Sequence, residues 1–192
     1  MANVSELIQE AIDRAEDGDY QAAIALLTRA IALDGTKPQA FFERALALLD
    51  SERDREALPD LDRALELDPL FPGARGWRAR VLAGLGEHRR AAEDWLRELR
   101  DHPDGPPGMG VNPQTWADCA EQFALAGEPA RSIELLEEYL RAHAARVTAY
   151  ARFETAPLRL LARLLTEAGD TARAEEMRQR ARASPHRVPA DG

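Results

Sequence analysis

Apolar residues recur along this chain at spacings of three and four, the pattern of one face of an α-helix. Phe41, Ala45 and Leu48 lie at positions i, i+4 and i+7 and so form one such stripe. After a short turn a second stripe follows, made of Ala57, Leu61, Ala64 and Leu65. The pattern predicts two short helices, with small residues where they cross, packed as an antiparallel pair.

The predicted helix pair repeats with a period of 34 residues. The turn at Gly18-Asp19-Tyr20 recurs as Glu52-Arg53-Asp54 and again as Gly86-Glu87-His88. Three units follow one another without a gap: Val4–Lys37, Pro38–Phe71 and Pro72–Gly105. Since a single pair cannot bury its apolar face, we expect the pairs to stack into a solenoid.

The pattern resumes after an offset of seven residues, with a fourth unit at Pro113–Arg146. A further offset at 147–154 leads to a fifth unit that begins near Thr155. The second helix of this fifth unit is polar, as the outer helix of a terminal repeat must be to meet water.

The chain resembles the tetratricopeptide repeat family. The resemblance rests on the 34-residue period, on the recurring turns and on alanines such as Ala45 and Ala57 where the helices cross. The match is strongest in Pro38–Phe71, although Glu52 replaces the turn glycine. The resemblance implies an all-α, right-handed solenoid of about five helix-turn-helix repeats. The repeat pattern and the local composition divide the chain into three contiguous units in 4–105, a Pro/Gly-rich inter-repeat loop in 106–112, two further units with a polar capping helix in 113–183, and a disordered tail in 184–192. The loop is either a surface connection or a hinge or flap.

Composition supports a helical fold. The chain has 36 Ala and 25 Leu but only 10 Val plus Ile, which excludes an all-β fold and nearly excludes a parallel α/β sheet. A single lysine, Lys37, stands beside 24 Arg, a bias typical of bacterial genomes rich in G and C. Cys119 alone can form neither an internal disulfide nor a cysteine metal site, and we expect it to be a small core residue.

The sequence predicts a cytoplasmic protein. Its first nine residues have neither a basic region nor an apolar run, so no signal peptide is expected. The chain has no run of about 18 apolar residues, the length that crosses a membrane, so no membrane span is expected.

The net charge of −9 argues against nucleic-acid binding, which requires a basic face. The charge is unevenly spread: residues 1–71 have 16 acidic and 7 basic side chains, and residues 147–192 have 6 and 8. This difference could orient a charged partner.

The chain has no sequence motif of an enzyme. It contains no phosphate-binding glycine loop, no zinc-binding His-Glu-x-x-His and no Gly-x-Ser-x-Gly. The four histidines fall in predicted turns or the tail, without the spacing of metal ligands. We therefore expect no catalysis, no metal and no cofactor.

In the family that the chain resembles, the first helices of the pairs line a concave, partner-binding face. The first helix of the second unit is apolar on two flanks, so it needs cover on both sides. Neighbouring helices cover one flank, and the other is covered either by a partner or, through tight superhelical curvature, by the chain itself. Apolar anchors are expected at Phe42, Leu46, Leu49 and Trp77. The full set of candidate partner-binding residues is Ile12, Phe42, Leu46, Leu49, Asp50, Trp77, Arg80, Glu121, Arg159 and Arg163.

These residues predict a scaffold or adaptor that binds a peptide or partner protein in the groove. The ligand's basic end would lie over the first two units and its acidic end over the last. Some family members clamp chaperone tails with Lys, Asn and Arg, but here the equivalent positions of the first two units carry Ile8, Ile12 and Glu43, so we expect no such clamp. The alternative is a self-assembly module that forms homodimers through the apolar flank of the second unit.

Overall fold

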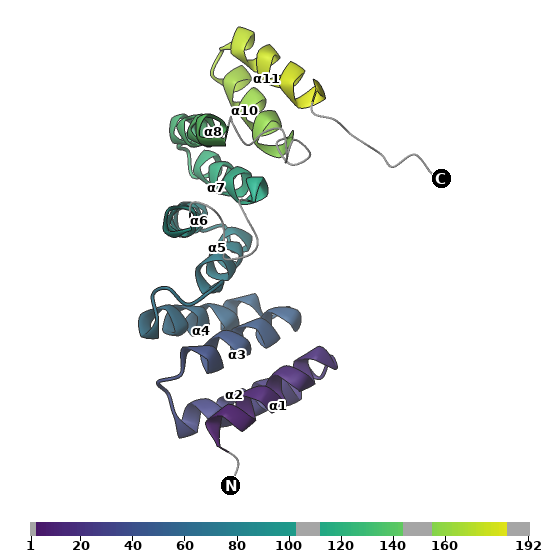
Figure 1. The fold of residues 1–192 in the computed structure, drawn as a ribbon, viewed down its shortest axis with the longest axis vertical. Helices are drawn as coiled ribbons and strands as arrows, with labels where there is room; N and C mark the ends of the chain where they lie inside the picture. Colours follow the sequence, from purple (N-terminus) through teal and green to yellow (C-terminus); the bar gives the residue numbers. More distant parts are fainter. Residues whose placement is uncertain (1–2, 103–111, 144–154, 184–192) are drawn as a thin grey trace, which may run out of the picture. The chain divides into compact units, whose positions relative to one another are not determined.

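The computed structural model describes residues 3–102, 112–143 and 155–183. These residues form ten α-helices and no strand (Figure 1). The helices are α1 (Val4–Glu16), α2 (Tyr20–Leu33), α3 (Pro38–Asp50), α4 (Asp54–Leu67), α5 (Ala74–Gly84), α6 (His88–Asp101), α7 (Pro113–Leu125), α8 (Pro129–His143), α10 (Thr155–Glu167) and α11 (Thr171–Ala183). This confirms the all-α fold of helix-turn-helix repeats.

The chain divides into two compact units, Met1–Glu87 (unit 1) and His88–Gly192 (unit 2). In unit 1, α1 packs on α2, α3 on α4, and neighbouring pairs pack on one another. In unit 2, α6 packs on α7, α7 on α8 and α10 on α11. The third predicted repeat is divided between them, with α5 in unit 1 and α6 in unit 2. The predictions for the tail and for 147–154 lie outside the described residues, as does the loop 106–112 except Asn112.

Each first helix of a pair ends in the same backbone turn. After α1, the amide of Asp19 donates to the carbonyl of Arg14 over 2.8 Å, and Gly18 between them has a φ of 80°. Such a left-handed residue with a 6→1 hydrogen bond closes the helix end and satisfies its last carbonyls. The same bond follows α3, where Glu52 takes the left-handed conformation with a φ of 60°. This repeated turn therefore explains why the turn residues recur every 34 residues in the first three repeats.

Alanines allow the helices of unit 1 to pack closely. Ala45 and Ala57 are wholly buried where α3 meets α4, beside Leu61 and Val81. The same helices share an ion pair in which the Arg44 guanidinium donates two hydrogen bonds of 2.7 Å to the buried carboxylate of Asp60. This paired geometry satisfies a charge that would otherwise be costly to bury.

Unit 2 has its own core, centred on large side chains such as Phe123, Leu136 and Leu161. Cys119 is wholly buried, and its Sγ donates to the carbonyl of Ala92 over 3.3 Å. Burial raises the pKa of the Cys119 thiol to about 12, so it stays an unreactive thiol. The expectation of a core cysteine is confirmed.

None of the described helices combines the length and apolar content that crossing a bilayer requires.

Candidate functional site

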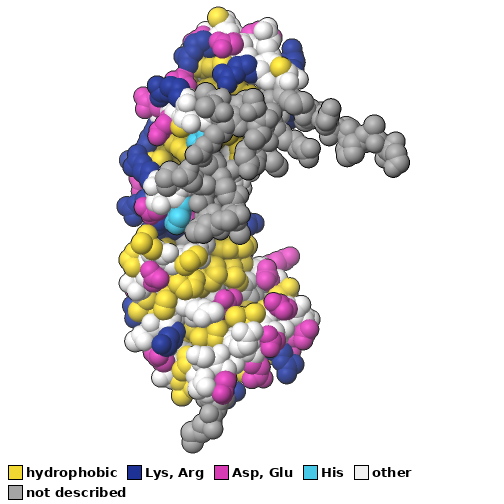
Figure 2. Space-filling model, in the orientation of Figure 1, with side chains coloured by type: hydrophobic (Ala, Val, Ile, Leu, Met, Phe, Trp, Pro, Cys, Tyr) yellow, Lys and Arg dark blue, Asp and Glu magenta, His cyan; other side chains and the backbone are white. Residues whose placement is uncertain are grey.

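Three predicted anchors gather beside a core cluster that α3 and α5 share in unit 1, and a fourth lies next to them on α3. Phe42, Leu49 and Trp77 all pack against the core cluster between α3, α4 and α5. Leu46 lies one turn beyond Phe42 on the same helix. With Phe71, whose ring centroid is 5.1 Å from that of Phe42, these residues form what we call the α3–α5 surface. Figure 2 shows apolar side chains gathered on the visible face of unit 1, with acidic side chains along its edge.

The α3–α5 surface is half open. Phe42, Leu46, Leu49 and Trp77 are each of intermediate exposure. Part of the second apolar flank of α3 is thus covered within the chain, by Phe71 and α5, and part remains in contact with water. Half-exposed aromatic and aliphatic side chains in one patch are typical of a surface that a partner covers.

Sequence reasoning assigned no role to Phe71. It lies between Leu70, which is 64% exposed, and Pro72 in the connection from α4 to α5. The sequence feature that could have indicated a role was the apolar pair Leu70-Phe71 in the exposed connection between α4 and α5. The packing of its ring on Phe42 could not be read from spacing, because the path of the connection is set by the crossing of α4 and α5.

Charged side chains lie on the helices that form the α3–α5 surface. The guanidinium of Arg80 lies over the Trp77 ring, 4.4 Å from its centroid, within reach of a cation–π interaction. Asp50 ends α3 and is exposed. Glu43, on α3, is half-buried, and this loss of water raises the pKa of its carboxyl above the ordinary value. A ligand cation beside Glu43 would stabilise the charged carboxylate, as water does for an exposed one.

Ile12 occupies a different place. It packs against the core cluster formed by α1, α2 and α3, whose members include Leu7 and Ala40. Ile8 is buried in that same cluster, at 5% exposure. Ile8 is therefore a core residue, whereas Ile12 packs against the core and remains partly exposed, as Phe42 and Trp77 do.

In unit 2, the structure brings three predicted residues together on α7 and α10. Arg163 donates a hydrogen bond of 2.9 Å to the Glu121 carboxylate, and its Nε lies 3.8 Å from Glu167. Glu121 and Arg163 therefore compensate one another's charge. Arg159 is exposed one turn before Arg163.

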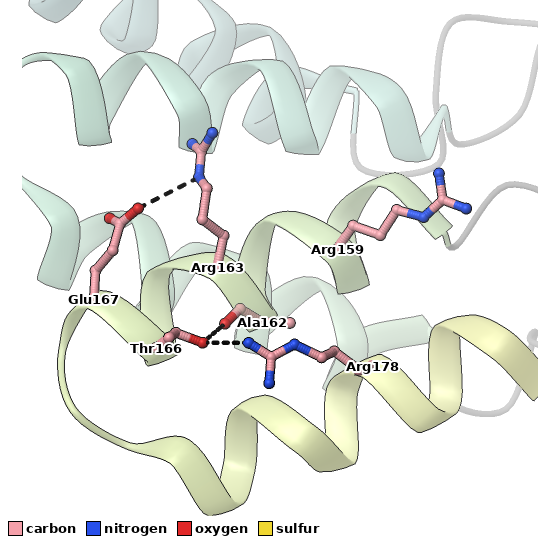
Figure 3. A pocket seen from close by; sticks show the side chains of 6 residues that line it. All are labelled: Arg159, Ala162, Arg163, Thr166, Glu167 and Arg178. Atoms are coloured by element: carbon pink, nitrogen blue, oxygen red, sulfur yellow. Dashed lines mark hydrogen bonds and ion pairs between the residues drawn. The ribbon is translucent and has the colours of Figure 1, made fainter.

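A cavity of about 390 Å³ opens beside these arginines, between α10 and α11. Its walls are Arg159, Ala162, Arg163, Thr166, Glu167 and Arg178 (Figure 3). We call it the arginine pocket. Arg178 reaches from α11 toward α10, where its Nη2 donates to the Thr166 hydroxyl over 2.7 Å. Thr166 in turn donates to the carbonyl of Ala162 over 2.7 Å.

The sequence does not predict a binding role for Arg178, because it lies on a second helix and the expected partner-binding face is formed by first helices. Its place in the pocket follows from the way α11 folds back on α10 after the turn at Gly169. Within the described residues, no group of three or more His, Cys, Asp or Glu side chains is placed to hold a metal ion.

A family model described as tetratricopeptide repeat matches residues 8–54 and 42–106 of the chain. The chain is 29% identical over 123 residues to the tetratricopeptide repeat and J domain-containing co-chaperone DNJ1 of Cryptococcus neoformans var. grubii, covering 64% of this chain and 24% of that protein. It is 38% identical over 78 residues to serine/threonine-protein phosphatase T of Trypanosoma brucei brucei, covering 41% and 16%. The chain thus spans about a quarter or less of the length of these relatives.

Solved structures share the fold across nearly the whole chain. MamA of Desulfovibrio magneticus RS-1 superposes with a TM-score of 0.75 at 13% identity, covering 99% of both chains. YrrB, described as a TPR protein with an unusual peptide-binding site, superposes with a TM-score of 0.76 at 13% identity, covering 97% of this chain and 88% of YrrB. At such identities the likeness concerns the fold.

Proposed function

Because the chain belongs to the tetratricopeptide repeat family, whose members generally mediate protein–protein interaction, we propose that it is a non-enzymatic scaffold or adaptor. It binds a peptide segment of a partner protein on the α3–α5 surface, through apolar anchors and complementary charge. The half-open state of Phe42, Leu46 and Trp77 is the observation that carries this proposal. We place the protein, as part of the same proposal, in a bacterial cytoplasm.

The ligand's chemistry follows from the surface. Apolar side chains of the peptide would cover Phe42 and Leu46. Fully burying such a side chain contributes about 1.5–3 kcal/mol, and less for one already half-buried. Lys or Arg side chains would lie beside Glu43 and Asp50. Repeat proteins bind segments of this kind along extended faces, and YrrB's description as a peptide-binding protein agrees with such a role.

The proposal is tested with peptides selected from a displayed library of random 12-residue segments against the full chain. We expect selected peptides to combine large apolar residues with Lys or Arg. The double substitution Phe42→Ala and Leu46→Ala should weaken their binding at least tenfold, since a tenfold change needs only about 1.4 kcal/mol. The far-ultraviolet circular dichroism of the variant should remain helical.

A matched control removes apolar side chains elsewhere. Leu33 and Leu125 are 65% and 56% exposed, and changing both to Ala should leave peptide affinity unchanged. Equal affinity of the Phe42/Leu46 variant and the parent would overturn the proposal. Light scattering at several concentrations tests the homodimer alternative, because a dimer that the Phe42/Leu46 substitutions dissociate would assign the surface to a second copy of the chain.

A further inference from the structure

We propose that the arginine pocket between α10 and α11 binds a carboxylate side chain, that of Asp or Glu, from an acidic peptide segment. The assignment uses residues of unit 2 alone. It rests on the proposed function in one respect, which is that the ligand is a peptide.

Three arginines line the pocket, Arg159 and Arg163 from α10 and Arg178 from α11, and their guanidinium groups point in different directions (Figure 3). Arg159 has no hydrogen-bond or ion-pair partner within the described part of the chain. It is exposed and comes from the first half of α10. A ligand can therefore bind the Arg159 guanidinium without first breaking an ion pair between described residues.

The second guanidinium, that of Arg178, is held in place. Its Nη2 donates to Thr166 and its Nη1 lies 3.3 Å from the Glu175 carboxylate. The Thr166 hydroxyl is itself fixed, because it donates to the carbonyl of Ala162. A guanidinium fixed before binding loses less side-chain entropy on meeting an anion than a freely rotating one.

The charges around the pocket disfavour a ligand with more than one negative charge. Arg163 is already paired with Glu121 and faces Glu167, and Arg178 is already paired with Glu175. Arg159 is the guanidinium of the pocket that pairs with no described residue. A carboxylate brings one negative charge toward it, whereas a phosphate dianion would bring two negative charges beside Glu167 and the other carboxylates.

The remaining wall fits a short acidic side chain. Ala162 and the aliphatic stems of the arginines give the pocket an apolar lining. The methylene groups of Glu would lie against it while the carboxylate meets Arg159. This surface differs from the chaperone-tail clamp, whose Lys and Asn positions the first repeats do not provide.

Fluorescence anisotropy tests the assignment with a dye-labelled decapeptide of alternating Glu and Ala, blocked at both ends so that no terminal carboxylate is present. Matched peptides carry Gln or phosphoserine in place of Glu. The full chain should bind the Glu peptide at least fivefold more tightly than the Gln peptide. Arg159→Gln should remove about fivefold of that affinity, the magnitude of one partly exposed charge-assisted contact.

Arg141→Gln is the matched control, since Arg141 is an exposed arginine of α8 and does not line the pocket. It removes the same charge and should leave binding unchanged. Equal binding of the Glu and Gln peptides, or equal losses in the Arg159 and Arg141 variants, would overturn the assignment. Tighter binding of the phosphoserine peptide would overturn the choice of carboxylate. The Phe42/Leu46 variant should bind the Glu decapeptide normally, so this proposal and that for the α3–α5 surface fail separately.

Discussion

Glu43 affects both the stability of the folded protein and the charge of the ligand that the α3–α5 surface would prefer. Its carboxylate lies on α3 beside the apolar anchors and is half withdrawn from water, which raises its pKa. The folded state therefore holds the Glu43 proton more firmly than the unfolded chain does. Stability contributed by this group falls as the pH rises from the ordinary glutamate pKa through the raised value. An acid in such a place costs stability and is useful where a cation meets it.

Binding of a basic peptide to the α3–α5 surface should tighten as the pH rises through the raised pKa of Glu43, because the ligand's cation favours the charged carboxylate. Glu43→Gln should flatten that dependence and raise the melting temperature at neutral pH. Titrations between pH 4 and 8 with a selected peptide, together with thermal melts, measure both effects. An unchanged pH profile in the Gln variant would remove Glu43 from the site.

At the scale of the element, the turn after each first helix is a repeated structural unit. In four of the repeats the left-handed position is Gly18, Gly86, Gly127 or Gly169, with φ between 80° and 85°, and in the second repeat it is Glu52. A side chain in this conformation costs about 1–2 kcal/mol in backbone strain. The second repeat, which carries most of the candidate anchors, therefore has a strained turn next to its first helix.

Replacing Glu52 by Gly should stabilise the protein by about 0.5–1 kcal/mol, because relief of strain exceeds the added entropy of the unfolded glycine. Gly86→Ala is the converse control, and should destabilise by about 1 kcal/mol. A Cβ at Gly86 would meet nothing within 4 Å, so its effect arises from the backbone alone. Urea unfolding of the two variants measures both changes, and a destabilised Glu52→Gly variant would contradict the strain argument.

At the scale of the whole molecule, charge is distributed unequally along the chain. The acidic excess of residues 1–71 belongs to unit 1, and the basic excess of residues 147–192 belongs to unit 2. The two candidate surfaces follow this division, since the α3–α5 surface is bordered by Glu43 and Asp50 and the arginine pocket by Arg159. One ligand with a basic and an acidic segment would match both.

We expect a peptide with an apolar-basic segment and an acidic segment, joined by a flexible Gly-Ser linker, to bind more tightly than either segment alone. The gain should be about tenfold or more where the linker spans both sites, because the second contact becomes intramolecular. Raising the salt concentration should reduce the gain, since exposed charges are screened. Calorimetry at two ionic strengths measures this, and equal affinities of the joined and separate segments would contradict it.

The sequence alone determined the helices and where they end. Spacings within one helix, such as Phe41 to Ala45 to Leu48, report which face is buried, and the recurring turns report the ends, because both are local properties of the backbone. The same spacings placed Phe42, Leu46 and Leu49 together on α3. They also identified Cys119 as a core residue.

The tertiary structure alone decided which side chains from different helices meet. Phe71 packs on Phe42, Arg178 reaches Thr166, and Arg163 pairs with Glu121, although none of these partners shares a helix. Ile12, an expected binding residue, packs against the core formed by α1, α2 and α3 and remains partly exposed. Such contacts depend on crossing angles and on the paths of connections, which are fixed by the sum of many packing interactions. A periodic pattern records the face a residue occupies, and the packed structure decides what covers that face.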